Sequence, residues 1–178
     1  MRTKSLNYSL ITLILIIFTG FNVNSQNLKS ITSNILVEGT SNIHDWEMTS
    51  KNAVGHIESK DGKVSKITIE IPIKSLKSGK GGMDKNAYKA LNEDDYPKVK
   101  FTSKEVQSNK IIGNLTMNGK SKTISIPVSI KNSNQNIKIS GKQTINMTDY
   151  GVEPPTALMG TIKTGEEVTV NFNFQFNQ

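Results

Sequence analysis

Apolar and polar side chains alternate with a period of two along most of this chain. The clearest segment reads VSKITIEIPIKS over residues 64–75, and the alternation returns in KTISIPVSIK over 122–131 and in EVTVNFNFQFNQ over 167–178. Successive side chains of a β-strand point to opposite faces, so each segment predicts a strand with one buried and one solvated face. The apolar faces carry Ile67, Ile69, Ile71 and Ile73 in the first segment, Ile124, Ile126, Val128 and Ile130 in the second, and Val168, Val170, Phe172, Phe174 and Phe176 in the third.

Weaker versions of the same pattern predict further strands. They cover residues 30–37, 54–58, 99–105, 111–117 and 136–147. The connections at Asp61-Gly62, Asn118-Gly119 and 132–136 have the composition of hairpin turns, because Asn and Gly tolerate a positive φ. Pro72 and Pro127 lack an N–H donor and are expected near strand ends, bulges or edges. About eight antiparallel strands predict an all-β domain, which closes as a barrel or packs as a two-sheet sandwich.

Two segments depart from the alternation. Within residues 82–97, Met83, Ala87 and Leu91 recur at helical spacing, which predicts a short helix that packs on the open end of the sheet. Residues 148–165 are too rich in Pro and Gly for a strand and are expected to form an irregular loop. The apolar run Ala157, Leu158 and Met159 then lies on that loop, where apolar residues call for an explanation.

The N-terminus reads as an export signal. Arg2 and Lys4 precede a short apolar core at residues 10–18, and Val23 and Ser25 have the spacing of a signal-peptidase site. The apolar run is about half the ~20 residues that a membrane span needs, so no stable transmembrane span is expected. We therefore interpret 1–25 as a signal peptide and 26–178 as one periplasmic or secreted domain, with an uncleaved N-terminal anchor as the alternative.

Composition removes several classes of function. The chain has no Cys and only two His, His44 and His56, which excludes disulfides, Cys-ligated metals, thiol nucleophiles and a three-His zinc site within one subunit. The formal charge is +7, but the lysines are spread along the chain without interleaved exposed aromatics, so no nucleic acid partner is expected. Neither a metal nor a cofactor is expected.

A ligand cavity is one of two readings of the apolar faces. Gly113 and Gly141 fall on those faces, which is compatible with a hollow barrel and equally with barrel corners around a solid core. Gln143 shares the parity of the apolar residues around it and is expected to offer a hydrogen bond inside. Met83, Leu91, Leu158 and Met159 are candidates for a mouth or gate, since Met adapts its shape. A hollow barrel would be lined by Ile69, Ile71, Phe101, Leu115, Met117, Ile126, Val128, Ile139, Val170, Phe172 and Phe174.

His44, Asp45 and Trp46 form the one cluster with chemical variety. Neighbouring residues on a strand point to opposite faces, so His44 and Asp45 cannot easily share a proton in that conformation. A structural role or a polar contact to a ligand headgroup at the mouth is favoured for His44, over catalysis or metal binding. Trp46 is expected to be an anchor near the barrel end.

Five segments together resemble the exported YceI-like proteins, and they occur in the order of that family over residues 30–176. They are VEGTSNIHDW (37–46), IPIKSLKSG (71–79), MDKNAYKALNEDDYPKVKF (83–101), GNLTMNGKSKTISIPV (113–128) and MTDYGVEPP (147–155). The resemblance implies a lipocalin-like antiparallel barrel, hollow and similar to those that bind long isoprenoid or other amphiphilic chains.

The sequence thus leads to three hypotheses about function. The first is an exported, non-enzymatic barrel that sequesters or carries a hydrophobic chain, such as an isoprenoid lipid or a quinone. The second is a solid-core module that binds a protein partner through residues 148–165 and 80–97. The third is a hydrolase or isomerase that uses His44 as a base. The oligomeric state stays open, a homodimer included.

Overall fold

The computed structural model describes residues 25–60, 62–133 and 135–177. The helical elements are α1 (Gly81–Ala90) and two 3-10 turns, η1 (Ile73–Ser75) and η2 (Met147–Tyr150). The strands are β1 (Ser25–Ser41), β2 (Trp46–Ser50), β3 (Val54–Lys60), β4 (Lys63–Pro72), β5 (Lys98–Val106), β6 (Lys110–Met117), β7 (Lys120–Asn132), β8 (Asn136–Asn146), β9 (Thr156–Ala157) and β10 (Ile162–Asn177).

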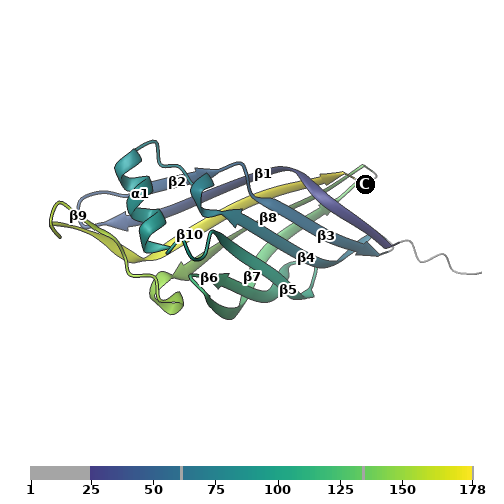
Figure 1. Ribbon diagram of the computed structural model, residues 1–178. Coiled ribbons are helices and arrows are strands. Elements are labelled where there is room, and N and C mark those ends of the chain that lie inside the picture. Colours follow the sequence, from purple (N-terminus) through teal and green to yellow (C-terminus); the bar gives the residue numbers. More distant parts are fainter. Residues whose placement is uncertain (1–24, 61, 134, 178) are drawn as a thin grey trace, which may run out of the picture.

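The strands form an elongated, closed antiparallel barrel (Figure 1). Strands β3 to β8 pair in sequence order, β8 pairs with β10, and β10 pairs back onto β1. Strands β2 and β3 act as one interrupted strand, because β2 pairs with Ile35–Gly39 of β1 and β3 pairs with Ser25–Lys29. The barrel therefore has eight strand positions, and the prediction of a barrel of about eight strands with one helix is confirmed.

Strands β7 and β8 pair over only part of their length. Their ladder runs from Asn132 opposite Ile137 to Val128 opposite Gly141 and ends beside Pro127, which has no N–H to donate. Beyond this point β7 pairs only with β6, and β8 only with β10. An ion pair of 2.6 Å between Lys122 and Asp149 ties the following turn, η2, to β7.

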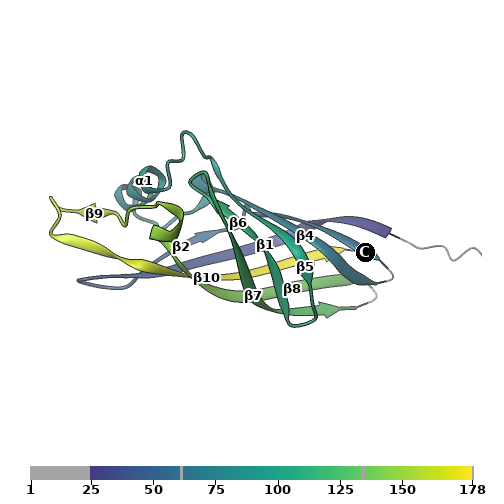
Figure 2. The same ribbon diagram turned by 90° about the horizontal axis from the view of Figure 1, so that it is seen from below.

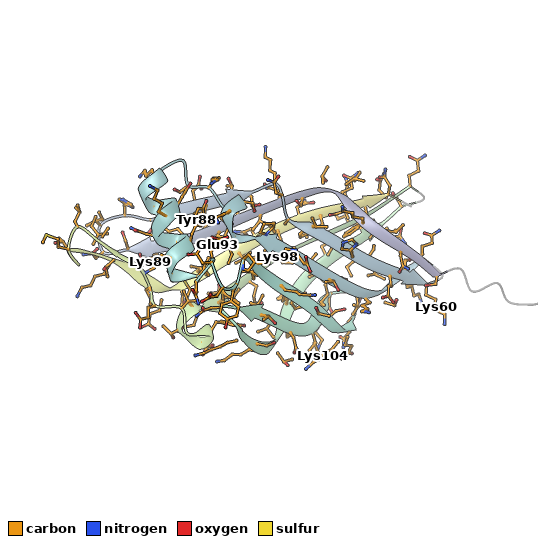
Figure 3. The ribbon with its side chains drawn as sticks, viewed as in Figure 1. Lys60, Tyr88, Lys89, Glu93, Lys98 and Lys104 are labelled. Atoms are coloured by element: carbon orange, nitrogen blue, oxygen red, sulfur yellow. The ribbon has the colours of Figure 1, made fainter. Side chains whose placement is uncertain are left out.

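Helix α1 lies at the end of the barrel that also holds β9 and η2, whereas the C-terminus lies at the opposite end (Figures 1 and 2). The Tyr88 hydroxyl donates to the carbonyl of Leu76 at 2.7 Å, and the Lys77 ammonium donates to that hydroxyl at 2.7 Å. Beyond the helix, Glu93, which Figure 3 labels close to Tyr88 of the helix, pairs with Lys74 at 2.8 Å. These contacts hold α1 to the segment that follows β4.

The N-terminal turn of α1 is fixed by a buried carboxylate. Asp84 accepts hydrogen bonds at Oδ1 from the backbone N–H of Ser78 at 2.8 Å and from its hydroxyl at 2.6 Å. These bonds hold the pKa of the Asp84 carboxyl below its ordinary value of 3.8. Asp84 therefore anchors the loop before the helix.

The expected turns and strands mostly form, with three corrections. Asn118 and Gly119 both have positive φ, 49° and 71°, as the hairpin prediction requires, and Gly62 has φ 72° while Asp61 lies outside the described residues. Strand β2 was not predicted, because its five residues are too short for a clear period. The irregular loop expected over 148–165 is wrong at its C-terminal part, since β10 already begins at Ile162, where it pairs with Ala157.

The third correction concerns the end of the strand predicted over 64–75. Strand β4 stops at Pro72, and Ile73 opens η1 with its side chain fully buried. The alternation of apolar residues therefore continues beyond the strand, because the side chain of Ile73 is buried in the turn as it would be in a strand.

Candidate ligand cavity

The barrel is hollow at the end covered by α1. A cavity of about 520 Å³ lies there, between the inner faces of the strands and the helix. Its walls come from β1, β2, β4, β5, β6, β8 and β10, and α1 contributes Met83, Asn86, Ala87 and Ala90 on its inner side. Met83 and Ala87, which recur at helical spacing, thus face the cavity rather than a filled core.

A smaller cavity of about 100 Å³ continues toward the other end. The two cavities share six aliphatic wall residues, which form a neck between them: Ile35, Ile71, Val99, Leu115, Ile145 and Val170. The small cavity is lined by apolar side chains together with Gln143, whose Nε2 donates to the carbonyl of Thr144 at 2.8 Å. The surface of this cavity is nevertheless apolar throughout, so a chain that passes the neck would meet hydrocarbon while the Gln143 amide stays bonded to the backbone.

Phenylalanine rings fill the inner end of the barrel. Phe172, Phe174 and Phe176 follow one face of β10, with successive ring centroids 6.4 Å apart. Phe174 and Phe176 are 1% and 0% exposed, respectively. Since aromatic rings at this spacing pack favourably, they make a solid floor below the small cavity.

Glycines make the room for these rings. A Cβ on Gly141 would lie 2.5 Å from the Phe172 ring, and one on Gly113 would lie 2.6 Å from the Phe101 ring. A Cβ on Gly55 would lie 2.9 Å from the Phe176 ring. Gly113 and Gly141 therefore lie where rings pack, whereas the hollow part of the barrel lies near α1.

The mouth of the large cavity carries its polar side chains. His44 lies in the exposed loop between β1 and β2, where its backbone N–H donates to the Ser41 hydroxyl and its Nδ1 lies 2.8 Å from the Asp45 carbonyl. Trp46 lies over Gly39, where a Cβ would meet its ring at 2.2 Å, and its Nε1 donates to the Thr40 carbonyl at 2.9 Å. The indole is thus fixed in place at the mouth.

An open, largely polar groove of about 700 Å³ adjoins the mouth and shares His44, Trp46, Lys80 and Met83 with the large cavity. Charged groups of both signs line it, including Glu38, Glu167 and Lys142. Within the described residues, no three His, Cys, Asp or Glu side chains stand close enough to hold a metal ion. In the same part of the chain, no helix has the length and apolar content of a membrane span.

Most of the residues proposed from the sequence line one of the two cavities. The large cavity is lined by His44, Trp46, Ile71, Met83, Leu91, Leu115, Met117 and Val170. The small cavity is lined by Ile69, Ile71, Phe101, Leu115, Ile126, Ile139, Gln143, Val170, Phe172 and Phe174.

Three of the proposed residues lie outside both linings. Val128 is partly buried against the core beside Gly141, at the point where β7 and β8 stop pairing. Leu158 and Met159, expected at a mouth or gate, lie on the exposed turn between β9 and β10 and wall neither cavity. Parity along a strand does not tell how far along the barrel the hollow part extends.

Comparison with known proteins now identifies the family. A model of the YceI-like domain matches residues 26–176. The chain belongs to the YceI-like family. No curated protein matches this YceI-like chain significantly.

Solved structures with the same fold are distant in sequence. BcnA from Burkholderia cenocepacia has a TM-score of 0.68 at 17% identity, covering 80% of this chain and 95% of its own. A polyisoprenoid binding domain from Saccharophagus degradans, implicated in plant cell wall breakdown, has a TM-score of 0.65 at 14% identity, covering 87% and 98%. The YCEI protein from Campylobacter jejuni has a TM-score of 0.51 at 15% identity, covering 100% and 99%. At these identities the likeness concerns the fold.

Sequence reasoning missed most of the wall of this YceI-like barrel. Ile35 and Val37 on β1, Met48 two residues after Trp46, and Ile145 two residues after Gln143 follow the same parity and could have been found from it. The other missed wall residues at the mouth, such as Val152, come from turns and loops that carry no periodic signal.

Proposed function

We propose that this YceI-like barrel binds one long hydrophobic chain, an isoprenoid lipid or quinone or another amphiphile, and carries or sequesters it without chemical change. The observation that carries the proposal is the 520 Å³ cavity whose depth is lined by hydrocarbon and whose polar residues gather at the mouth. That distribution suits a ligand with a long apolar tail and a polar head.

The cavity volume limits the length of the bound tail. At about 30 Å³ per non-hydrogen atom, the share of one water molecule in the liquid, 520 Å³ holds about 17 such atoms. The small cavity of 100 Å³ adds about three more if the neck is passed. The expected tail therefore has about fifteen to twenty carbons, which corresponds to about three or four isoprene units.

Burial of such a tail supplies enough free energy without a polar anchor. Each buried methylene contributes about 0.8 kcal/mol, so ten of them contribute about 8 kcal/mol. This gross gain corresponds to a Kd of about 1 μM before the entropic cost of binding. Burial of more than about ten methylenes offsets that cost, so the polar head can stay in solvent or make only a weak contact.

The groove at the mouth gives the polar head a place. His44 borders both the cavity and the groove, as does Lys80, so a head that leaves the cavity has an imidazole and an ammonium group within its surroundings. A His44→Ala variant is expected to keep nearly all affinity for the tail. Under the competing hypothesis of a hydrolase or isomerase, the same variant would lose turnover of an amphiphilic substrate.

A binding role rather than catalysis has support from the position of the reactive groups. The titratable side chains that border the large cavity, His44 and Lys80, stand at its mouth, away from the neck where a bound tail would lie. Family membership, together with the S. degradans relative described as a polyisoprenoid binding domain, supports the choice of ligand class.

The export part of the proposal depends on residues 1–25, of which 1–24 lie outside the described residues. A periplasmic or secreted location is expected, with Gln26 as the first residue of the mature chain. The intact mass of the protein recovered from the cell envelope tests this, because retention of residues 1–25 would point to an uncleaved anchor.

Native mass spectrometry tests the proposed ligand. The protein is purified from its own envelope, and the bound material is extracted into organic solvent and identified. A stoichiometric prenyl or acyl species is expected. A ligand-free mass, with no uptake of added long-chain lipid, would contradict the proposal and favour a module that binds a protein partner.

A further inference from the structure

The turn between β9 and β10 presents large apolar side chains to solvent. Leu158 and Met159 are 72% and 106% exposed, and Ile43, in the loop between β1 and β2, is 57% exposed. Asn42 joins the two segments, since its side chain donates to the Thr161 carbonyl at 2.9 Å and its amide oxygen accepts from the Lys163 N–H at 2.9 Å. We call Ile43, Leu158 and Met159 the apolar tip.

The backbone of the turn holds the two side chains outward. Leu158 and Met159 have φ of 48° and 56°, in the left-handed region that residues other than glycine rarely adopt. Backbone bonds of 3.1 Å from Gly160 to Ala157 and from Thr161 to Leu158 close the turn. These bonds hold the turn in its strained conformation, with both side chains projecting into solvent.

The apolar tip stands beside the entrance of the cavity. Ala157 and Ile162, which flank the turn on either side, both line the large cavity. In two perpendicular views the turn projects beyond α1 at the end opposite to the C-terminus (Figures 1 and 2). Whatever the tip contacts is therefore adjacent to the route into the barrel.

The shape of the tip distinguishes between a protein and a membrane. A stable protein interface buries about 800 Å² on each partner, which three side chains on projecting loops cannot supply. A bilayer needs no matching surface, because single apolar side chains gain free energy by leaving water at the headgroup boundary. The bilayer is also the phase in which a long hydrophobic chain is dissolved.

We propose that the apolar tip docks on a lipid bilayer and that the ligand passes directly between the bilayer and the cavity while the protein is docked. The exchange of ligand rests on the function proposed above, whereas the docking does not. Transfer on contact avoids the step in which a free chain crosses water.

Transfer from vesicles tests this proposal. Phosphatidylethanolamine and phosphatidylglycerol vesicles carry a prenol of about twenty carbons, and Trp46, the single Trp of the chain and a residue of the cavity mouth, reports its arrival. The test variant is the double substitution Leu158→Ser and Met159→Ser. The matched control is Ile31→Ser, because Ile31 is 53% exposed and lies about 33 Å along β1 from the end of that strand at the mouth.

For the wild type, the transfer rate is expected to rise with vesicle concentration, and the double variant is expected to be at least about tenfold slower. The control should match the wild type, and all three proteins should bind the prenol equally when detergent micelles present it. A double variant that transfers at the wild-type rate would overturn the proposal, as would a wild-type rate that does not depend on vesicle concentration.

A second measurement separates the docking from the ligand. Ligand-free wild-type protein is expected to float with vesicles, and the double variant is not. If no protein takes up prenol from micelles but the wild type still floats, the proposed function fails and the docking stands. If the wild type does not float and instead forms a stoichiometric complex with another protein through the tip, the docking on a bilayer is refuted.

Discussion

The substitution Val170→Phe tests whether the cavity holds the ligand. Val170 lies in the neck and lines both cavities. A Phe side chain has about four more non-hydrogen atoms than Val, so it displaces about four atoms of a bound chain from a well-filled cavity. At about 0.8 kcal/mol for each buried methylene, the loss is about 3 kcal/mol, which is about a hundredfold in Kd.

The chain offers a matched control in Val128→Phe. Val128 has the same apolar parity on β7, which β8 separates from β10, and it lies outside both cavity linings, so this variant is expected to keep wild-type affinity for the ligand. Titration of a prenol of about twenty carbons, followed by Trp46 emission, measures both affinities. Urea denaturation shows whether each variant is folded, and for Val170→Phe the free energy of unfolding should change little because the ring fills empty volume. A folded Val170→Phe protein that binds as tightly as the wild type would refute the reasoning, and so would equal losses in both variants.

Three further outcomes are expected. Phe172→Ala removes a ring between the small cavity and Gly141, so it should raise the ratio of the affinity for long prenols to the affinity for short ones in a competition assay. The expected cost is about 3 kcal/mol in the free energy of unfolding. An unchanged ratio would show that this ring does not limit the length of the bound chain. The pKa of Asp84 is lowered in the folded state, so the folded wild type binds fewer protons than the unfolded chain near pH 4. Its stability is therefore expected to fall as the pH drops through the folded pKa. Urea midpoints measured between about pH 2 and 7 should fall less steeply at acid pH for Asp84→Asn. Gly113→Ala would place its Cβ 2.4 Å from the Thr102 carbonyl oxygen and should destabilise the fold by about 1–3 kcal/mol. Gly82→Ala, whose Cβ would meet nothing within 4 Å beyond the backbone of its own helix, should stabilise the fold by about 0.5 kcal/mol. Thermal denaturation of the pair checks the contrast.

The hydrophobic period was enough to place most strands of the barrel, although not β2 or the exact ends of β4 and β10. The segments around Ile69, Ile126 and Phe174 each became a strand with the expected inner face, because a period of two leaves only one way to bury all the apolar side chains. Asn118-Gly119 became the expected hairpin turn for an equally local reason, since both residues accept a positive φ at little cost.

The position of the hollow region could not be read from these patterns. Val128 and Val170 are equivalent by parity, and only the second lines the cavities, because the distance of a residue from the mouth depends on strand stagger and tilt. In the same way, Gly141 and Gly39 look alike in the sequence, yet one makes room for Phe172 at the solid end and the other for Trp46 at the mouth.

The sequence by itself determined the all-β class, the inner faces of the strands and the helix near Met83. These properties follow from local side-chain chemistry and from the two periods of the backbone. Only the tertiary structure decided that the sheet closes, that phenyl rings fill one end and leave the other end empty, and that Leu158 and Met159 project beside the entrance. Those features depend on contacts between residues far apart in the chain, such as Gly141 with Phe172 and Asn42 with Thr161, and no local pattern encodes such contacts.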